Sequence, residues 1–229
     1  MDTHAFEQFL LDKGVVGFDK DGITLKSGKN THWYGNFRVL SQSQADLTKS
    51  AQFVVDFLID NDLLGDVNGV IGVPEGATLL GLEVHRQLVA AGKLPDVVYS
   101  LRVKSKEHGK PANRFWTNGN EPKKVIVLED VTTTGGSALE VIAKLRDAGV
   151  TVTHVVALLN RMQVNDEQQT VEQKMKTENL DYHALTNAVA ILPQLLEKQS
   201  DADRELFSQL IRKEYEKEYA GLGDVPVTL

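Results

Sequence analysis

The chain has 229 residues, which is enough for one domain with a sizeable buried core and an extension. Apolar residues make up 41% and charged residues 25%, the balance of an ordinary globular protein rather than a disordered or fibrous one. The chain has no cysteine, which excludes disulfides, thiolate metal sites and a cysteine nucleophile. A formal net charge of −7 argues against non-specific binding of nucleic acid through a basic surface.

We expect neither a signal peptide nor a membrane-spanning segment. No apolar stretch is long enough to span a bilayer. The N-terminal residues 1–14 carry acids and an amphipathic pattern, where a signal peptide would have a basic region and a long apolar run. We therefore expect a cytoplasmic protein that binds neither membranes nor nucleic acid.

Strand and helix patterns alternate along most of the chain. In the N-terminal half we predict a short helix at 5–14, a hairpin at 23–40, a helix at 45–58, a buried strand at 69–73 followed by a helix reaching Gly92, and a strand at 97–101. A long polar connection at 102–120 comes next, followed by a strand at 125–128, a helix ending at Gly149 and a strand at 150–159. The C-terminal part is predicted to hold a charged helix at 167–177, a strand at 181–185 with a helix after it, and an amphipathic helix at 201–219.

This order predicts an α/β fold with a Rossmann-like, mainly parallel sheet flanked by helices. The N-terminal hairpin lies outside that sheet, and we expect it to form a small hood together with a later strand. The hood is placed mainly at 20–40 and about 180–197 of a single domain that spans 1–229. The helix at 201–219 is treated as an extension.

The chain is organised around the stretch from Lys124 to Ser137, KVIVLEDVTTTGGS. Its apolar run at 125–128 predicts a strand that is buried on both faces of a parallel sheet. Glu129 and Asp130 follow where this strand ends, and a loop of threonines and glycines comes next. Ser137 is predicted to cap the following helix. In open α/β sheets, ligands bind beyond the carboxyl ends of strands, so this loop lies where a site is expected.

The composition of this loop favours phosphate binding. Glycines allow the backbone to approach an anion, threonine hydroxyls add donors, and the N–H groups that begin the helix carry partial positive charge. The two acids would repel a phosphate unless they bound sugar hydroxyls or a magnesium ion. The pattern therefore predicts a ribose 5-phosphate held at both ends, and the alternative is an ordinary strand, polar turn and helix.

The stretch EDVTTTGGS resembles the phosphoribosyl pyrophosphate (PRPP) signature of the type I phosphoribosyltransferases. The resemblance implies that the acidic pair binds the ribose hydroxyls and that the loop binds the 5-phosphate. It also implies that the loop after the strand at 69–73 lines the pyrophosphate through Gly76, with the role of Glu75 left open. The signature residues assigned to PRPP are Glu129, Asp130, Val131, Thr132, Thr133, Thr134, Gly135, Gly136 and Ser137.

Two N-terminal stretches, LKSGK and WYGNFRVLS, resemble the same region of the orotate phosphoribosyltransferases. The resemblance implies that Lys26 reaches both the substrate and the pyrophosphate, and that Tyr34 and Thr133 contact orotate. The chain departs from this family at three hood positions. Thr31 and His32 replace a Ser-Pro pair, and Gly35 stands where a larger residue is common, which leaves the preference for the base open.

The polar connection at 102–120 resembles the mobile catalytic loop of the same enzymes. A departing pyrophosphate gathers negative charge, so cations carried over it by a closing loop stabilise the transition state. The resemblance implies contacts to PRPP from Arg102, Lys104, Lys106 and His108, and His108 is a candidate proton donor. The implied catalytic residues are Lys106, His108, Arg102 and Asp130. The alternative for this segment is a disordered surface excursion.

The strand at 150–159 ends in Asn160, Arg161 and Met162. Arg161 matches the arginine that binds the carboxylate side of the pyrimidine in orotate enzymes, and a planar guanidinium suits a carboxylate. Asn160 replaces the acid that commonly precedes this arginine.

The resemblance as a whole implies that orotate and PRPP give orotidine 5-phosphate and pyrophosphate in pyrimidine synthesis. It implies a Mg²⁺ cofactor, for which we assign no direct protein ligand, and a homodimer in which the mobile loop acts on the neighbouring site. One alternative is a phosphoribosyltransferase for a purine or another base. A second is a non-catalytic PRPP-sensing regulator, which the loop cations and the acidic charge disfavour.

Overall fold

The structure, a computed structural model, describes residues 1–25, 28–102, 104, 114–220, 225–227 and 229. Its centre is a parallel sheet of four strands in the order β3-β4-β5-β6, which confirms the predicted α/β class. The strands are β3 (Gly69–Gly72), β4 (Lys124–Thr132), β5 (Thr151–Asn160) and β6 (Asp181–Asn187).

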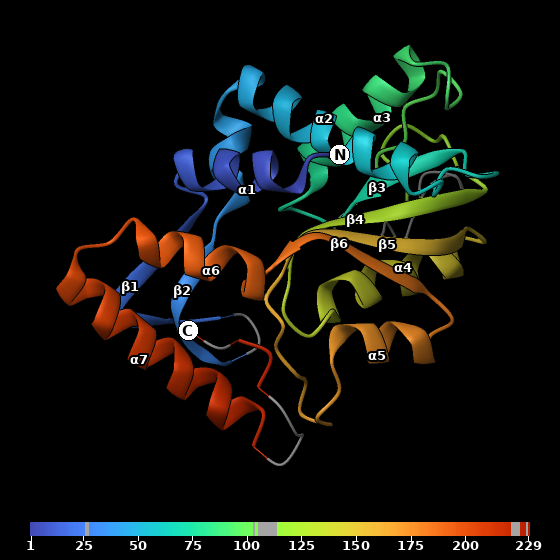
Figure 1. Cartoon of the computed structure of the whole chain (residues 1–229). Coiled ribbons are helices and arrows are strands. Elements are labelled where there is room, and N and C mark those ends of the chain that lie inside the picture. Colours follow the sequence, from blue (N-terminus) through green and yellow to red (C-terminus); the bar gives the residue numbers. More distant parts are fainter. Residues whose placement is uncertain (26–27, 103, 105–113, 221–224, 228) are drawn as a thin grey trace.

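Helices cover both faces of this sheet (Figure 1). One face carries α1 (Thr3–Asp12), α2 (Gln44–Asp60) and α3 (Thr78–Ala90). The other face carries α4 (Gly136–Asp147) and α5 (Val171–Thr177). The strands therefore separate two apolar clusters, one on each side of the sheet.

Strand β4 pairs with β3 on one side and β5 on the other, and its apolar residues 125–128 are completely buried. Ile126 and Leu128 belong to the cluster beneath α2 and α3, whereas Val125 and Val127 belong to the cluster on the side of α4. This alternation is the normal two-residue period of a strand. It continues past Leu128, so the next two residues of β4 also face opposite sides of the sheet.

The hood is a separate antiparallel pair, β1 (Val16–Thr24) and β2 (Asn30–Gly35), and a 3₁₀ turn at Phe37–Gln42 (η1) connects it to α2. Two C-terminal helices, α6 (Ala188–Glu197) and α7 (Asp201–Glu218), lie beside it (Figure 1). Buried residues of the hood and of both helices belong to the same apolar cluster as α2.

The later strand predicted for the hood lies elsewhere. Strand β6 pairs in parallel with β5 as the fourth strand of the main sheet, because helix α5 provides a crossover from the end of β5. The C-terminal helix α7 covers the hairpin instead, and the rings of Phe18 and Phe207 stack there at 4.4 Å. Of the predicted hood segment at about 180–197, the strand therefore belongs to the main sheet, whereas α6 lies beside the hairpin together with α7.

Two other local predictions differ from the structure. Residues 97–101 form no strand beside β3, because their backbone partners lie on the returning arm of the following connection: Arg102 N donates to Phe115 O and Thr117 N donates to Ser100 O. The charged helix begins at Val171 rather than 167, because Thr170 and Gln173 form a capping box at that point.

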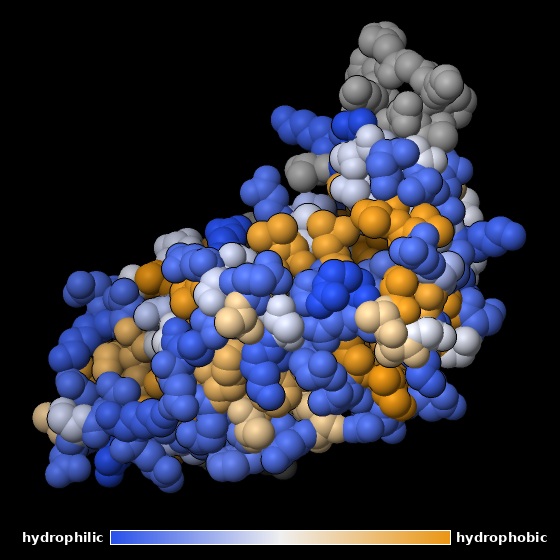
Figure 2. All heavy atoms as spheres, turned by 90° about the horizontal axis from the view of Figure 1, so that it is seen from above, coloured by the Kyte–Doolittle hydropathy of each residue, from blue (hydrophilic) through white to orange (hydrophobic). Residues whose placement is uncertain are grey.

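Among the residues described, five large apolar side chains are strongly exposed, and Figure 2 shows hydrophobic atoms gathered on part of one face. In this view, from the side of α1 to α3, hydrophobic residues reach the surface mainly toward the end that carries α3. No helix in the described part of the chain is both long enough and apolar enough to cross a bilayer. The exposed large apolar residues are Ile59, Leu79, Val98, Val189 and Leu206.

A buried carboxylate joins α2 to α3. Glu83 accepts hydrogen bonds from Arg86 Nε at 2.8 Å, Gln87 Nε2 at 3.0 Å and, across the helix pair, Thr48 Oγ1 at 3.2 Å. The hydrogen bond from Arg86 lowers the pKa of Glu83 from its usual 4.5 to about 2. Because the folded-state pKa is depressed, the carboxylate contributes stability above pH 4.5, and this contribution is lost as the pH falls toward 2.

We therefore expect Glu83→Gln to lower the free energy of unfolding at pH 7 by about 1–3 kcal/mol, because an amide cannot accept all of these donors. The difference from the wild type should shrink as the pH falls from 4.5 to 2. Urea unfolding at several pH values measures both effects, with Asp56→Asn, a change at a partly buried acid of α2, as the control. A difference that stays constant down to pH 2 would contradict this account.

Candidate active site

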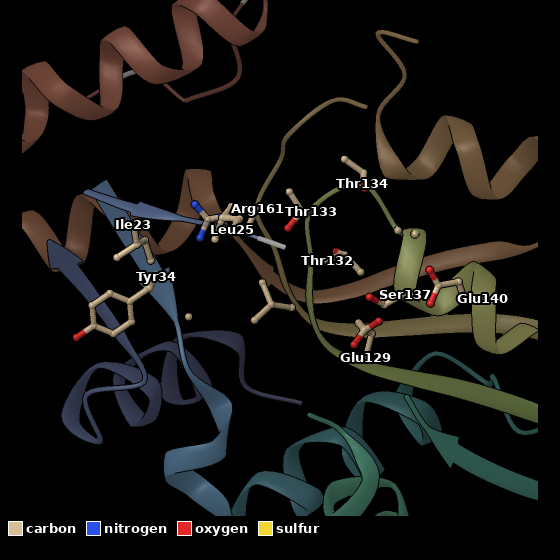
Figure 3. A pocket seen from close by; sticks show the side chains of 14 residues that line it. Ile23, Leu25, Tyr34, Glu129, Thr132, Thr133, Thr134, Ser137, Glu140 and Arg161 are labelled. Atoms are coloured by element: carbon tan, nitrogen blue, oxygen red, sulfur yellow. The ribbon is translucent and has the colours of Figure 1, made fainter. Parts of the chain in front are cut away.

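A cavity of about 440 Å³ opens at the carboxyl ends of β4 and β5, between the hood and the start of α4. Figure 3 shows its two sides. The hood side presents Ile23, Leu25 and Tyr34, with Arg161 next to them. The opposite side presents oxygen atoms from the end of β4 and from the first turn of α4. The residues of this second side are Glu129, Thr132, Thr133, Thr134, Ser137 and Glu140.

The loop on this second side has the local geometry of an anion cradle. Gly135 has a left-handed backbone (φ +79°) and is the N-cap of α4, so the helix begins at Gly136. Ser137, predicted as the cap, lies one residue inside the helix. The first N–H groups of a helix have no partner in the helix, and the helix dipole adds positive charge there. The predicted phosphate loop and the cavity therefore coincide.

The acidic pair is divided between two loops. Glu129 is 5% exposed and lines the cavity beside the threonine loop. Asp130 points to the opposite face of the sheet, where a Cβ added to Gly76 would lie 2.3 Å from its Oδ2 atom. Asp130 Oδ1 also accepts a hydrogen bond from Val131 N at 2.8 Å. Because of the alternation along β4, Glu129 lies beside the threonine loop and Asp130 lies beside the loop that follows β3.

The loop after β3 turns back tightly on its own strand. A Cβ on Gly72 would lie 1.8 Å from Ala77 O, so only glycine fits at this position. The peptide bond between Pro74 and Glu75 is cis, and Glu75 is exposed. Gly76 lies against Asp130, so the loop predicted to line the pyrophosphate adjoins the acidic pair.

Arg161 sits at the hood end of the cavity and is almost completely enclosed, with 1% of its surface exposed. Its Nη2 donates to Thr31 Oγ1 at 2.7 Å, its Nη1 donates to Trp33 O at 3.2 Å, and the guanidinium lies 3.8 Å from the centre of the Trp33 ring. Burial lowers the pKa of Arg161 from its usual value. The threonine that replaces the serine expected in the hood therefore binds this arginine.

Asn160 organises the turn after β5. Its Oδ1 atom accepts a hydrogen bond from Met162 N at 2.8 Å, and its Nδ2 atom donates to Glu172 Oε1 at 2.7 Å. An asparagine can make both bonds because its amide is an acceptor and a donor at once. The acid that commonly precedes the arginine in orotate enzymes is thus replaced by a residue that ties the end of β5 to α5.

The structure describes only the two ends of the connection that is predicted to be catalytic. Arg102 Nε donates to Trp116 O at 3.2 Å, and Lys104 is exposed. Neither of these two residues lines the cavity. Lys26, Lys106 and His108 lie outside the described residues, so their predicted roles stay predictions.

Sequence reasoning missed several residues of the site. Ile23, Leu25 and Glu140 line the cavity, and the hairpin alternation and the helix spacing from Ser137 were the available signals for them. Tyr182 on β6 hydrogen-bonds Thr132 through its hydroxyl, and burial raises the pKa of this tyrosine. No sequence signal joins Tyr182 to Thr132, because their strands are not neighbours in the sheet.

Comparisons with known proteins identify the family. The chain is 32% identical over 161 residues to the orotate phosphoribosyltransferase of Methanospirillum hungatei, a match that covers 70% of this chain and 84% of that protein. It is 30% identical over 149 residues to the same enzyme from a Bradyrhizobium species, covering 63% of this chain and 77% of the relative. The chain belongs to the orotate phosphoribosyltransferase family.

The fold agrees with this membership. The crystal structure of the orotate phosphoribosyltransferase from Francisella tularensis superposes with a TM-score of 0.66 at 20% identity, over 91% of this chain and 98% of that one. No family model matches the chain. Of the positions at which the sequence departs from the expected pattern, Thr31 and His32 in the hood and Asn160 at the end of β5 make specific hydrogen bonds.

The left-handed backbone of Gly135 yields a stability prediction. We expect Gly135→Ala to lower the free energy of unfolding by about 1–3 kcal/mol, because an L-residue is strained at this φ. The new Cβ would also meet Met175 Cε at 2.8 Å. Gly136→Ala is the matched control, since its Cβ meets only Thr134 Oγ1, at 3.9 Å, and alanine favours a helix. Equal stability of the two variants in urea unfolding would refute the assignment of strain to Gly135.

Proposed function

We propose that this member of the family catalyses the family's reaction: the 5-phosphoribosyl group passes from PRPP to orotate, and orotidine 5-phosphate and pyrophosphate form in pyrimidine nucleotide synthesis. The observation that carries the proposal is the polarity of the cavity. One end is a phosphate cradle with a carboxylate beside it, and the other end is an apolar slot with a buried cation.

Each part of PRPP is assigned to a particular group of residues at the site. The 5-phosphate is assigned to the N–H groups and hydroxyls from Thr132 to Ser137, and the ribose hydroxyls to the Glu129 carboxylate. Asp130 and Gly76, which touch each other on the far side of β4, are assigned to the junction of the ribose and the pyrophosphate. Both acids therefore stay assigned to PRPP, but each is assigned to a different part of that molecule.

The opposite end suits an anionic pyrimidine. Leu25, Tyr34 and Val131 give an apolar slot for a flat ring, and Thr133 lies across from them. Arg161 is the cation among the described residues that line the cavity. An orotate ring carries a carboxylate, and a guanidinium binds a carboxylate through two parallel hydrogen bonds. The base site therefore favours orotate over a neutral purine.

The reaction needs no protein nucleophile. N1 of orotate attacks C1 of the ribose and loses its proton to solvent as the bond to the pyrophosphate oxygen breaks, through a state with oxocarbenium character. Positioning of the two substrates and stabilisation of the leaving charge supply most of the rate enhancement. Lys26, Arg102, Lys104, Lys106 and His108 are assigned to the pyrophosphate, with His108 as the proton donor to its departing oxygen.

Magnesium fits the site as an ion held mainly by the substrate. Among the described residues there is no cluster of three or more metal-ligating side chains, and Mg²⁺ commonly uses one or two carboxylates together with substrate phosphates. Glu129 is a cavity carboxylate of the required kind, and a bound Mg²⁺ would offset the charge of the pyrophosphate. The homodimer and the cytoplasmic location stay predictions.

The proposal predicts that purified protein consumes orotate only when both PRPP and Mg²⁺ are present. The loss of orotate absorbance measures turnover, and pyrophosphate release gives an independent readout. Adenine and hypoxanthine serve as competing bases, because neither carries the carboxylate that Arg161 would bind. Turnover of a purine without turnover of orotate would replace this function by the purine alternative.

Glu129 provides a test within the site. We expect Glu129→Gln to lower kcat/KM for PRPP by about 10- to 100-fold, because a charged acceptor for the ribose hydroxyls becomes a neutral one. Glu178→Gln is the control, since this acid pairs with Arg146 at the surface beyond the end of α5. If both variants keep wild-type kcat/KM for PRPP, the ribose is not held by Glu129.

A further inference from the structure

The C-terminal end of helix α7 forms hydrogen bonds with the backbone of the segment that follows β5. Tyr215 Oη donates to Arg161 O at 2.5 Å, and Tyr219 Oη donates to Met162 O at 2.8 Å. Glu218 Oε1 accepts a hydrogen bond from Val164 N at 3.1 Å. One face of α7 therefore fixes the backbone that carries Arg161 into the cavity, although no residue of α7 lines that cavity.

Glu214, on the same face, acts on the Arg161 side chain itself. Its Oε1 atom lies 3.8 Å from Nη2 of Arg161, and its side chain is 9% exposed. A buried guanidinium needs a compensating charge, because removing a cation from water without one is costly. Glu214 supplies that charge from outside the cavity.

Glu214 also sets the orientation of two groups that hold Arg161. Thr31 Oγ1 donates to Glu214 Oε2 at 3.0 Å and accepts from Arg161 Nη2 at 2.7 Å. Gln163 Nε2 donates to Glu214 Oε1 at 3.2 Å, while Gln163 Oε1 accepts from Arg161 Nε at 3.1 Å. A carboxylate only accepts, so it makes both neighbours donate to it and turn their acceptor oxygens toward Arg161.

These contacts leave part of the guanidinium for a ligand. A guanidinium has five N–H donors, and the hydrogen bonds to Thr31, Gln163 and the Trp33 carbonyl use three of them. The ring of Trp33 fixes the plane of the guanidinium from one side. Arg161 is therefore held in one orientation at the base end of the cavity.

We propose that Glu214 of the C-terminal helix is a positioning residue for orotate recognition. It orders Thr31 and Gln163 and thereby holds the Arg161 guanidinium in the orientation that receives the orotate carboxylate. The proposal rests on the proposed function, since it concerns the base end of the same site. It also assigns a role to α7, because the helix completes the base site without touching the substrate.

Glu214→Gln tests the proposal, because an amide keeps the shape of the side chain but can donate as well as accept. We expect the KM for orotate to rise about tenfold, the change that ~1.4 kcal/mol of lost binding produces. The KM for PRPP and kcat should stay within about twofold of wild type, because tenfold effects are expected only at the base end. A merely structural role of α7 would change both KM values or neither.

Glu218→Gln is the matched control. Glu218 lies one turn further along the same face of α7 and holds Val164 N and Lys29 Nζ, and none of its hydrogen bonds goes to Arg161, Thr31 or Gln163. Its loss should disturb the contact between α7 and the segment after β5 to a similar degree, but it should raise the KM for orotate by much less than Glu214→Gln does. Equal values of this KM in the two variants would overturn the proposal.

A second variant keeps the test valid if Glu214→Gln does not fold. Thr31→Val removes the hydroxyl between Glu214 and Arg161 and keeps its volume, and it should also raise the KM for orotate selectively. Where both variants fold, the double variant should cost less than the sum of the single ones, because both act through Arg161. Additive effects, or an unchanged KM for orotate in Thr31→Val, would contradict the proposed path.

A fluorescence readout separates this proposal from the proposed function. The chain has two tryptophans, so Trp116→Phe leaves Trp33, which stacks on Arg161, as the single reporter. In that background Glu214→Gln should shift the Trp33 emission, and Glu218→Gln should not. Wild-type protein without orotate turnover would refute the function, whereas an unshifted Trp33 emission in Glu214→Gln would refute the positioning role.

Discussion

The alternation of side chains along strand β4, whose residues 125–128 are completely buried, is the constraint on which the rest of the site depends. Ile126 and Leu128 must face α2 and α3, while Val125 and Val127 must face α4, because both faces of the strand are packed. With this register fixed, Glu129 reaches the cavity and Asp130 reaches Gly76. Two consecutive acids can then serve two loops that lie on different sides of one strand.

A second constraint is the buried charge of Arg161. Among the described residues the hairpin shares no ladder with the main sheet, so its position depends on side-chain packing and on hydrogen bonds at the hood end of the cavity. The guanidinium contributes three such links, to Thr31, the Trp33 carbonyl and the Trp33 ring. Because a buried cation must be compensated, the hood, the end of β5 and α7 form one connected unit.

Local patterns in the sequence predicted the parts of the fold that depend on local rules. The buried strand at 125–128, the glycine that ends each of several helices, and the loop of threonines and glycines before α4 all follow from periodicity and from helix-terminus chemistry. The prediction of a strand at 97–101 was wrong, because an apolar pattern does not reveal which segment will pair with it. This segment forms hydrogen bonds with residues 115–117 and not with β3. The strand at 181–185 was recognised but assigned to the hood, since its pairing with β5 is a property of the topology.

The candidate site shows the same division. Glu129 and the threonine loop could be located from one continuous stretch of sequence, because strand end, loop and helix start are contiguous. The residue that compensates the charge of Arg161 could not be located in this way, since Glu214 lies on a helix that sequence patterns identify only as amphipathic.

From the sequence alone, Thr31 could be described only as a departure from the family pattern, because its hydrogen-bond partners were unknown. The hydroxyl of Thr31 lies between Arg161 and Glu214, and a serine in its place would offer the same hydroxyl. His32 stands in the position of the expected proline, and its backbone N–H donates to Glu214 at 3.3 Å. Proline has no N–H to donate, so the two hood departures and the C-terminal helix are parts of one arrangement.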